Sequence, residues 1–573
     1  MTIVLLLFLD IENIFAQIFR MTMGAFNRLW QLILLDRKEI GAVYFYAILS
    51  GLLQLSVPIG IQAIISFVLG ASMVTSIYIL IVLVVIGVFS VGMMQINQMK
   101  IIEKIQQRIF TRNAYDFAEK VPRFDLIKMD NHYLPEKVNY FFDTLNVQKG
   151  LSKLLLDVPA ASIQILFGLL LLSLYHPVFI VFGLLLILVL WLILKLTATS
   201  GLASSLTEST YKYAVVEWLT EIARVIKSFK FSQGTHLNLK KTDERVSGYL
   251  NARTTHFKVL LVQYQTLVFF KVAITTVMLT AGTYLLVNQQ LNIGEFIAAE
   301  IVIFTVIGAV EKLIGSLDSV YDVVTGLEKL AVISESPLEN EGDVELDTRG
   351  EGLDIQFKEF SFSYPNAKKV LRDLNFHIKS NSTVCVRTQE GSGKSTLLKV
   401  LSGNYADFEG SLLLNKLPIN SYQLESLRTQ VGIFLNQQDI FMGTVWENIA
   451  MGREEIKQED VMDVAEGLGI AHFLNQLPGG FNTQLDPSGK KMPSTLVRYI
   501  LLLRAFANQP KLVLLEDPWE GLEPEVEAKI KQYLLNNLPH TTLVITSQDE
   551  DFARRCDAQI VLTNGSANFV TQN

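Results

Sequence analysis

The sequence predicts an all-α domain that spans a membrane, followed by a soluble α/β domain. Three observations carry this prediction. Hydrophobic residues make up 50% of the chain and charged residues 18%, a balance typical of a protein that lies partly in a bilayer. Between residues 40 and 316 the sequence contains long apolar runs. From Leu353 onward the apolar runs are short and alternate with polar residues, as in a soluble domain large enough to bury a core.

The first domain is predicted to cross the bilayer six times. Each apolar run is close to or above the roughly 20 residues that a membrane helix needs. Pro58 should kink the first of these helices, because proline removes a backbone donor, and Gly60 eases the bend. The predicted spans are residues 40–68, 74–96, 154–175, 178–197, 263–287 and 294–316.

The distribution of positive charge predicts which connections lie in the cytoplasm. The short links at residues 70–72, 176–177 and 288–292 contain no Lys or Arg, whereas the long connections 97–153 and 198–262 are rich in both. Connections rich in Lys and Arg stay in the cytoplasm. We therefore expect an integral, multi-pass membrane protein with both termini and both long connections in the cytoplasm.

The two long connections are expected to be helical hairpins that continue the spans into the cytoplasm. Apolar residues recur at three-to-four spacing from Met99 to Ile109, which is typical of one face of a helix. We expect the chain to turn back at residues 122–125 and at residues 218–222. Gly150 should break the returning helix of the first hairpin. Two such hairpins are suited to contacting a second domain.

Three charged residues lie in or near the apolar helices. Glu300 lies mid-span, between Ala299 and Ile301, where a charge costs a few kcal/mol and usually faces a cavity or a partner. It is therefore our candidate for a transport pathway, although a protonated or hydrogen-bonded packing role fits equally well. Lys271 and Glu311 can instead extend to the membrane interface.

The chain is expected to begin with a cytoplasmic or interfacial segment, residues 1–36. Its apolar run from Ile3 to Leu9 is too short to span a bilayer and lacks the basic region and cleavage site of a signal peptide. Met21 or Met23 could be the true start. The rest divides into a membrane domain at 37–330, a linker at 331–352 and a soluble domain at 353–573, and the acidic linker has the composition of a disordered joint.

Composition excludes some partners. A formal net charge of −7 is modest for this length and gives no indication of nucleic acid binding. The two cysteines, Cys385 and Cys556, lie far apart and show no metal-binding spacing, so we expect packed, reduced thiols in the cytosol.

The soluble domain contains a candidate phosphate-binding loop. A β-branched run from Ser382 to Val386 precedes a Gly-rich turn, and a helix is expected from Leu397. In this context backbone N–H groups and the helix N-terminus bind the phosphates of a nucleotide. The expected nucleotide-binding residues are Thr388, Gln389, Glu390, Gly391, Ser392, Gly393, Lys394, Ser395 and Thr396.

The residue types in this loop suit that chemistry. Gly391 and Gly393 let the chain curl around phosphate oxygens. Lys394 supplies a point charge for the outer phosphates, and Ser395 supplies a hydroxyl for Mg²⁺. Thr388 stands where the usual motif has its first glycine.

With six spans, two long hairpins and this C-terminal domain, the chain resembles a half-transporter of the ABC exporter family from Ile40 to its end. The membrane half is most similar to the group of type I secretion ATPases, without a peptidase domain in front. The resemblance implies an all-α, six-helix type I exporter transmembrane domain followed by an α/β P-loop NTPase, the ABC ATPase domain. It also implies ATP and Mg²⁺ as cofactors and a second half-transporter chain as partner.

Two further motifs resemble nucleotide contacts of the family. The stretch from Phe362 to Pro365 is similar to the loop that stacks on adenine, with Tyr364 as the ring. Asn436 falls at the position of the glutamine loop, where its carbonyl can reach Mg²⁺ or water. Gln437 could replace it after a shift of one residue.

Other motifs depart from the family pattern. Where the family reads LSGGQ, this chain has Met492 to Leu496, so that Pro493, Ser494 and Thr495 would face the nucleotide of the partner subunit in trans. Proline lacks an N–H, and two side chains replace the glycines that permit close backbone approach. The downstream helix again follows the family pattern from Ile500 to Phe506, including Arg504 and Ala505.

The apolar strand from Lys511 to Leu515 ends in two acids in reversed order. The resemblance implies that Glu516 holds Mg²⁺ and that Asp517 is the general base. Exchanging the two side-chain lengths moves each carboxylate by about 1 Å, and misplacement on this scale can cost 10²-fold in rate. Ser547 replaces the switch histidine and cannot act as a cation.

We therefore expect a half-subunit of an ATP-driven exporter that moves a lipid, peptide or polypeptide out of the cytoplasm, with weak intrinsic hydrolysis. A heterodimer with a more competent half-transporter is favoured, and a homodimer is possible. The expected location is the bacterial inner membrane, and a periplasmic adaptor is a further possible partner. The alternative is a nucleotide-sensing membrane protein that does not pump. A P-loop enzyme merely tethered to a membrane is disfavoured, because it would not need two long hairpins.

Overall fold

The structure, a computed structural model, divides into two compact units. Unit 1 comprises Met1–Pro122 and Tyr133–Ser336, and unit 2 comprises Arg123–His132 and Pro337–Asn573. The predictions about a signal peptide and about the start residue concern residues 1–23, which lie outside the described residues. The described residues are 24, 27–70, 75–129, 134–232, 235–348, 350–365, 367–388, 391–436, 440–486 and 492–571.

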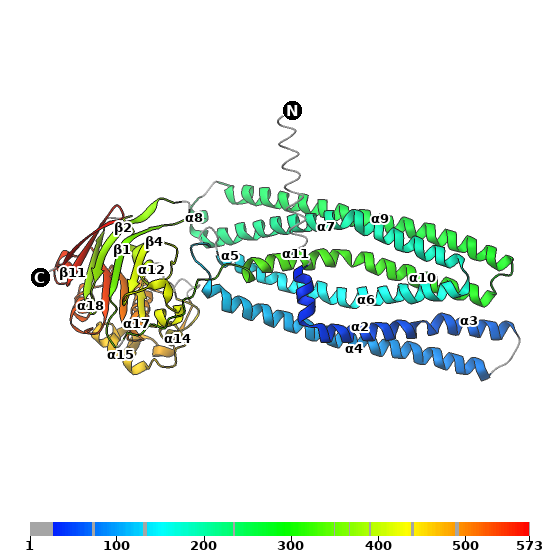
Figure 1. The fold of residues 1–573 in the computed structure, drawn as a ribbon, viewed down its shortest axis with the longest axis horizontal. Coiled ribbons are helices and arrows are strands. Elements are labelled where there is room, and N and C mark those ends of the chain that lie inside the picture. The colour runs from blue at the N-terminus through cyan, green and yellow to red at the C-terminus, as the bar shows by residue number, and fades with distance from the viewer. Residues whose placement is uncertain are drawn as a thin grey trace, which may run out of the picture. The chain divides into compact units, whose positions relative to one another are not determined.

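Unit 1 is a bundle of long helices (Figure 1). The part of the chain that the structure describes contains six helical stretches long and apolar enough to cross a membrane, as the sequence predicts. The protein is therefore an integral membrane protein. The helices are α2 (Arg37–Gln54), α3 (Ser56–Leu69), α4 (Thr75–Lys120), η1 (Val121–Arg123), α5 (Leu134–Val138), η2 (Asn139–Phe142), α6 (Asp143–Tyr175), α7 (Val178–Arg224), α8 (Ile226–Phe231), α9 (Leu237–Val287), α10 (Ile293–Gly315) and α11 (Leu317–Ser334).

The first membrane crossing is interrupted close to Pro58. Helix α2 ends at Gln54 and α3 begins at Ser56, with Leu55 between them. Pro58 has no N–H to donate to the carbonyl of Gln54, so one helical hydrogen bond is lost at this point. The break lies one turn before the proline that predicts it.

The prediction that Gly150 breaks a helix is wrong. Helix α6 passes through Gly150 without interruption and packs against α11. A Cβ atom built on Gly150 would lie 2.5 Å from Cγ2 of Val323 and 3.2 Å from the carbonyl oxygen of Ser319. The glycine therefore permits close approach of two helices, and this packing outweighs its low helix propensity.

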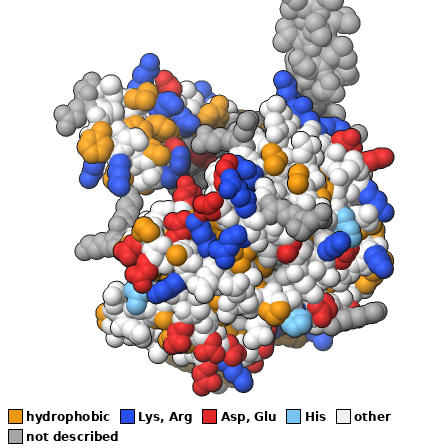
Figure 2. All heavy atoms as spheres, turned by 90° about the vertical axis from the view of Figure 1, so that its left-hand side faces the viewer, with side chains coloured by type: hydrophobic (Ala, Val, Ile, Leu, Met, Phe, Trp, Pro, Cys, Tyr) orange, Lys and Arg blue, Asp and Glu red, His pale blue; other side chains and the backbone are white. Residues whose placement is uncertain are grey.

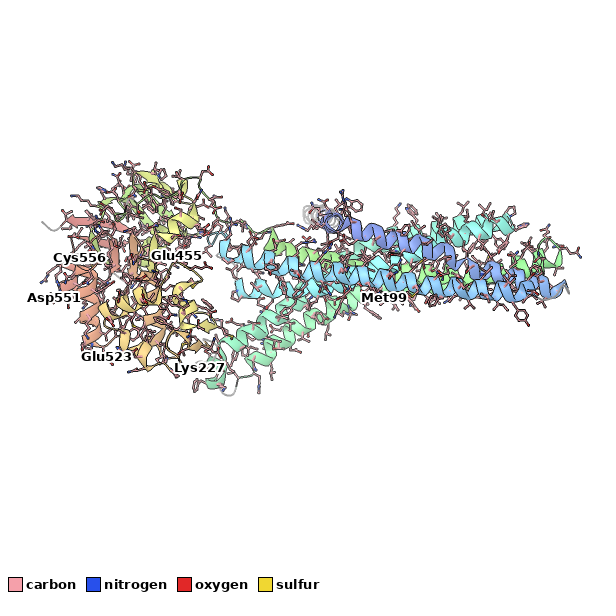
Figure 3. All side chains as sticks on the ribbon, turned by 90° about the horizontal axis from the view of Figure 1, so that it is seen from below. Met99, Lys227, Glu455, Glu523, Asp551 and Cys556 are labelled. Carbon is pink, nitrogen blue, oxygen red and sulfur yellow. The ribbon has the colours of Figure 1, made fainter. Side chains whose placement is uncertain are left out.

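The turn predicted at residues 218–222 is also misplaced. Helix α7 continues to Arg224, and the chain turns through Val225 and α8. Trp218 remains helical because its indole N–H bonds to α9, 3.1 Å from Oγ1 of Thr242. Lys227 lies on α8, at the tip of the hairpin formed by α7 and α9, which diverges from the other helices of unit 1 (Figure 3).

The apolar face predicted in the first hairpin is mostly correct. Ile102, Ile105 and Ile109 on α4 are buried. Met99, which the same spacing includes, is exposed (Figure 3). Of these four predicted residues, only the three isoleucines are part of the buried core of unit 1.

The charged residues of the apolar helices lie on α9 and α10. Lys271 of α9 and Glu311 of α10 form an ion pair with an N–O distance of 3.2 Å, and both side chains are nearly half exposed. Glu300 of α10 is half-buried, and no ion pair or hydrogen bond of its side chain occurs within the described residues. The charges of Lys271 and Glu311 thus neutralise one another. Glu300 remains the candidate residue for a transport pathway.

Unit 2 contains the α/β fold that the sequence predicts. An antiparallel sheet has the order β2-β1-β4-β5, and a larger sheet has the order β12-β11-β3-β10-β9-β6. In the larger sheet all neighbours are parallel except β11 and β12. The strands are β1 (Ile355–Ser363), β2 (Lys369–Ile378), β3 (Thr383–Thr388), β4 (Glu409–Leu414), β5 (Leu417–Pro418), β6 (Val431–Phe434), β7 (Gly443–Thr444), β8 (Gln484–Leu485), β9 (Leu512–Glu516), β10 (Thr542–Thr546), β11 (Ala558–Thr563) and β12 (Ser566–Thr571).

Helices cover this sheet, and two hydrophobic clusters form the core of unit 2 (Figure 1). Strands β9 and β10 are completely buried, in keeping with their apolar sequences. On the face of the molecule shown in Figure 2, basic and acidic side chains are interspersed. The helices are α12 (Lys394–Leu401), η3 (Ile419–Ser421), α13 (Leu424–Thr429), α14 (Val445–Ala450), α15 (Gln458–Gly467), α16 (Ala471–Gln476), η4 (Gly480–Asn482), α17 (Ser494–Phe506), α18 (Pro524–Asn536) and α19 (Glu550–Ala553).

The segment that follows α4 belongs to unit 2. Phe124 is buried and pairs with Leu338, and the amide of Asp125 donates to the carbonyl of Pro337 over 3.0 Å. The carboxylate of Glu339 also binds the guanidinium of Arg428, with an N–O distance of 2.6 Å. The acidic joint that the sequence suggests is disordered is therefore ordered here, and the division between the two units falls after Ser336, within the linker predicted at residues 331–352.

Gly432 on β6 provides a test of the core of unit 2. A Cβ atom built there would lie 1.9 Å from the carbonyl oxygen of Ala505 on α17. Because that oxygen cannot move without displacing α17, we expect Gly432→Ala to destabilise unit 2 by about 3 kcal/mol or more. The measurement is the midpoint of thermal unfolding of the full chain in detergent.

The matched control is Gly92→Ala on α4, where the added Cβ meets nothing within 4 Å. Its unfolding midpoint should be equal to or slightly above that of the unaltered protein, because alanine has a higher helix propensity than glycine. A Gly432→Ala midpoint that matches the control would contradict the described packing of α17 on β6.

Candidate nucleotide-binding site

The parallel strand order brings several polar residues to one edge of the sheet. Strand β3 ends at Thr388, β6 at Phe434, β9 at Glu516 and β10 at Thr546. Because these strands are parallel, their carboxyl ends meet at the same edge, which is the usual place of a ligand in an open α/β sheet. The phosphate-loop residues follow the end of β3.

The loop after β3 curls in the way a phosphate site requires. Gly391 and Gly393 have φ angles of 77° and 100°, which L-residues with a side chain rarely adopt. Gly393 caps α12, and its carbonyl accepts the first intrahelical bond, from the amide of Leu397 over 2.9 Å. The amides of the first turn therefore point out of the helix end, where they favour an anion.

Acidic side chains from the end of β9 bind the polar residues of the loop. The ammonium of Lys394 lies 2.5 Å from Oδ2 of Asp517. The hydroxyl of Ser395 donates to Oε1 of Glu516, which is buried. The structure thus brings together four of the predicted site residues.

Asn436 and Arg498 complete this arrangement. The backbone N–H of Asn436 donates to Oε2 of Glu516 over 3.1 Å. The guanidinium of Arg498, on α17, donates to the carbonyl oxygen of Asp517 over 2.8 Å and to Oδ1 of Asn436 over 3.4 Å. We call the six linked residues the polar ring: Lys394, Ser395, Asn436, Arg498, Glu516 and Asp517.

The pKa values of the two cations in the polar ring, Lys394 and Arg498, are shifted in opposite directions. Partial burial acts to lower the pKa of Lys394, but the hydrogen bond with Asp517 and the charges of Asp517, Glu516 and Glu520 outweigh it, so that this pKa is raised. Burial lowers the pKa of Arg498, and the same neighbouring acids Glu520 and Asp517 oppose that effect only in part. An arginine remains charged in proteins, so both residues are cations at neutral pH.

Tyr364 and Thr388 lie against the loop. The hydroxyl of Tyr364 is 3.1 Å from Oγ1 of Thr396, and its ring makes edge contacts with Phe362 and Tyr405. The carbonyl of Thr388 accepts a hydrogen bond from the side-chain amide of Gln548. Tyr364 therefore borders the phosphate loop, although its ring is half-buried.

Ser547 is placed differently from a phosphate contact. It is buried, its amide donates to the carbonyl of Val386 over 3.2 Å, and its hydroxyl accepts from the amide of Asp549 over 3.1 Å. This hydrogen bond stabilises the turn before α19. The neighbouring Gln548 is the residue that contacts the loop.

The segment around Pro493 forms the start of α17. The helix runs from Ser494 to Phe506 and so includes the stretch from Ile500 to Phe506 that follows the family pattern. Pro493 accepts from the amides of Leu496 and Val497, at 3.0 and 3.4 Å, which holds the first turn together without the usual glycines. Pro493 and Ser494 are exposed and Thr495 is half-buried.

Some predicted residues cannot be placed, and some relevant ones were missed. Gln389, Glu390 and Gln437 lie outside the described residues. Arg498, Gln548 and Thr546, whose hydroxyl lies 3.2 Å from the amide of Asp517, were not predicted. A sequence signal existed only for Arg498, because it is a single cation between apolar and aromatic residues at the start of a helix.

The donor atoms of the polar ring fit a magnesium ion. Mg²⁺ prefers oxygen ligands and commonly takes only one or two from the protein, the rest coming from phosphates and water. Ser395, Glu516 and Asn436 offer a hydroxyl, a carboxylate and an amide oxygen. Within the described ranges no cluster of three or more His, Cys, Asp or Glu residues could hold a metal by itself. A metal bound here would also take oxygens from the nucleotide and from water.

Comparison with known proteins agrees with this geometry. Residues 371–520 match the profile of the family described as ABC transporter. The structure also resembles that of a bacterial Atm1-family ABC exporter with ATP bound, with a TM-score of 0.80 and 17% sequence identity over 93% of this chain and 95% of the other. The chain carries an ABC transporter domain on an exporter fold.

Curated relatives match this ABC transporter domain and its surroundings. The uncharacterised ABC transporter ATP-binding protein YknV of Bacillus subtilis is 28% identical over 51% of this chain and 48% of its own length. The glutathione/L-cysteine transport system ATP-binding/permease protein CydC of Haemophilus influenzae is 28% identical over 48% of this chain and 50% of its own length. The chain thus spans about half the length of the curated relatives it matches.

Proposed function

We propose that the protein is a half-subunit of an ATP-driven exporter that binds MgATP and hydrolyses it slowly by itself. The observation that carries the proposal is the polar ring, which joins the phosphate loop to two carboxylates at the carboxyl edge of a parallel sheet. Six candidate membrane helices in the same chain supply the transport half. One nucleotide domain and six helices make half a pump, so a second chain is needed.

Each residue of the site has a role in nucleotide binding. The amides at the start of α12 and the ammonium of Lys394 bind phosphate oxygens, for which Lys394 must leave Asp517. Ser395, Glu516 and Asn436 would hold Mg²⁺, which when bound neutralises phosphate charge. Tyr364 would contact the base, and Gly391 and Gly393 let the backbone approach the phosphates.

The same geometry argues for slow hydrolysis. Asp517, in the position of the general base, is one methylene shorter than glutamate, and its carboxylate is bound by Lys394. Ser547 has its hydroxyl bonded to the amide of Asp549. Pro493, Ser494 and Thr495 offer the partner subunit a helix end with fewer accessible amides. Loss of one preorganised contact typically costs a few kcal/mol of barrier.

The assembly and the cargo follow from this proposal. A heterodimer is favoured, because an intact partner would supply its own signature segment to the polar ring of this chain. We expect the bacterial inner membrane, with both termini in the cytoplasm, and an adaptor in the periplasm as a further partner. The cargo class is a lipid, an apolar peptide or a polypeptide, and Glu300 is the candidate residue on its path. A non-pumping nucleotide sensor is not favoured, because the similarity to an exporter extends over the membrane helices.

The test compares binding with turnover in one preparation of the purified chain. We expect MgATP to bind at cellular concentrations while phosphate release stays well below about 1 s⁻¹, the low end of typical enzymes. Addition of a co-purifying half-transporter should raise the rate. Brisk turnover by the isolated chain would contradict the proposal.

A further inference from the structure

Arg498 contributes a positive charge to the nucleotide site from within the same chain. It lies on the first turns of α17, half-buried, with its guanidinium 5.3 Å from the centre of the Phe434 ring. One of its nitrogens bonds to the carbonyl of Asp517 and the other to the amide oxygen of Asn436. Both partners are residues that the proposed function places at the nucleotide.

The polar ring is closed through this arginine. Lys394 binds Asp517, Arg498 links Asp517 to Asn436, Asn436 binds Glu516, and Glu516 binds Ser395, which follows Lys394 in the chain. Without Arg498, no side-chain hydrogen bond among the described residues would connect Asn436 to Asp517. The ring therefore sets the positions of α12, β9 and α17 relative to one another.

The charges around the ring show what Arg498 offers a ligand. Three carboxylates, those of Glu516, Asp517 and Glu520, act on the two cations Lys394 and Arg498. A polyphosphate entering this site meets an excess of acid unless further positive charge is present. Arg498 reduces that excess, and because its guanidinium lies 3.4 Å from Oδ1 of Asn436, a metal that binds this oxygen competes with Arg498 for it.

We propose that Arg498 is a positioning residue that supplies part of the positive charge normally provided by Mg²⁺, so that this chain binds ATP with a reduced requirement for Mg²⁺. The inference rests on the proposed function, since it concerns the same nucleotide site. Arg498 attracts the polyphosphate and repels a divalent cation at the same place. Free ATP and MgATP should therefore bind with similar affinity.

The experiment measures the dissociation constant of ATP for the purified full chain, once with excess Mg²⁺ and once with EDTA. In the unaltered protein the constant without Mg²⁺ should exceed the constant with Mg²⁺ by less than about tenfold. In Arg498→Gln we expect this ratio to rise by about tenfold or more, because affinity for free ATP falls while affinity for MgATP is kept or improved. Arg498→Lys keeps the charge and should restore the ratio.

Arg453→Gln is the matched control. Arg453 is a half-buried arginine of the same unit that lines a separate cavity of about 300 Å³ beside β6, so its removal should leave the ratio unchanged. If Arg498 has a purely structural role, Arg498→Gln will raise the dissociation constants with and without Mg²⁺ by the same factor. The ratio of the two constants will then be unchanged, and this result would overturn the inference.

The outcomes separate this inference from the proposed function. If the unaltered chain binds no ATP under either condition, the proposed function fails. If it binds MgATP but the ratio is above about tenfold, the function stands and the role of Arg498 is refuted. That measurement on the unaltered protein decides the matter even if Arg498→Gln does not fold.

Discussion

Replacing Lys394 by alanine is expected to weaken MgATP binding by about 100-fold. Charge-assisted contacts to phosphate contribute up to about 3 kcal/mol, and each 1.4 kcal/mol is about tenfold in affinity. The loss also leaves Asp517 without its partner at 2.5 Å, so an unbalanced carboxylate would face the phosphates. Calorimetric titration of the purified chain with MgATP measures the effect.

Lys399→Ala is the control for this substitution. Lys399 lies on the same helix, α12, half-exposed, and its side chain is not part of the polar ring. Its removal should change affinity by less than about twofold. Equal affinities of the Lys394→Ala and Lys399→Ala proteins would show that the nucleotide, if bound, is bound elsewhere.

The affinity should also be insensitive to pH near neutrality as far as Lys394 is concerned. Its pKa is raised in the folded protein from an ordinary 10.5. A raised lysine pKa means that the charge and its stabilising contribution are fully present below the ordinary value and are lost only as pH rises through the folded value. Lys394 thus stays protonated throughout the range in which binding would be measured.

Exchanging the two acids at the end of β9 should raise the rate of hydrolysis by about tenfold or more. The double variant Glu516→Asp with Asp517→Glu gives the proposed general-base position the longer side chain and the proposed metal position the shorter one. Each carboxylate then moves by about 1 Å, a displacement that can be worth 10²-fold in rate. Phosphate release at saturating MgATP measures the gain, with the dissociation constant determined in parallel.

The matched control for this exchange is Asp517→Asn, which removes the base and should abolish the residual rate. The remaining departures at Pro493 and Ser547 limit the gain, so we expect a partial recovery only. A double variant that binds MgATP as before and hydrolyses it no faster would show that carboxylate length does not limit turnover.

Features that depend on local pattern could be predicted from the sequence. The lengths of the apolar runs give six membrane helices, and the β-branched run before Gly391 gives a strand, loop and helix. The apolar run from Leu512 to Leu515 gives a buried strand that ends in two acids. These inferences require only local periodicity and composition. The order of the strands, which brings Glu516 close to Ser395, is known only from the structure.

Features that depend on packing between distant segments were not predictable. Gly150 looked like a helix breaker, but α11 covers it closely and the helix persists. The turn after Trp218 comes later because the indole binds α9, a contact no local pattern encodes. Arg498 stands out in the sequence as a single cation among apolar residues, but it contacts Asn436 across 62 residues of sequence, so its membership of the polar ring is seen only in the folded chain.

The central claim is that the polar ring receives the phosphates of a nucleotide. Its most direct test is calorimetric titration of the purified, unaltered chain with MgATP, with the Lys394→Ala protein titrated alongside. We expect one nucleotide per chain with a dissociation constant below about 1 mM, and a dissociation constant about 100-fold higher with Lys394→Ala. Absence of binding by the unaltered chain, or equal binding by both proteins, would contradict the account.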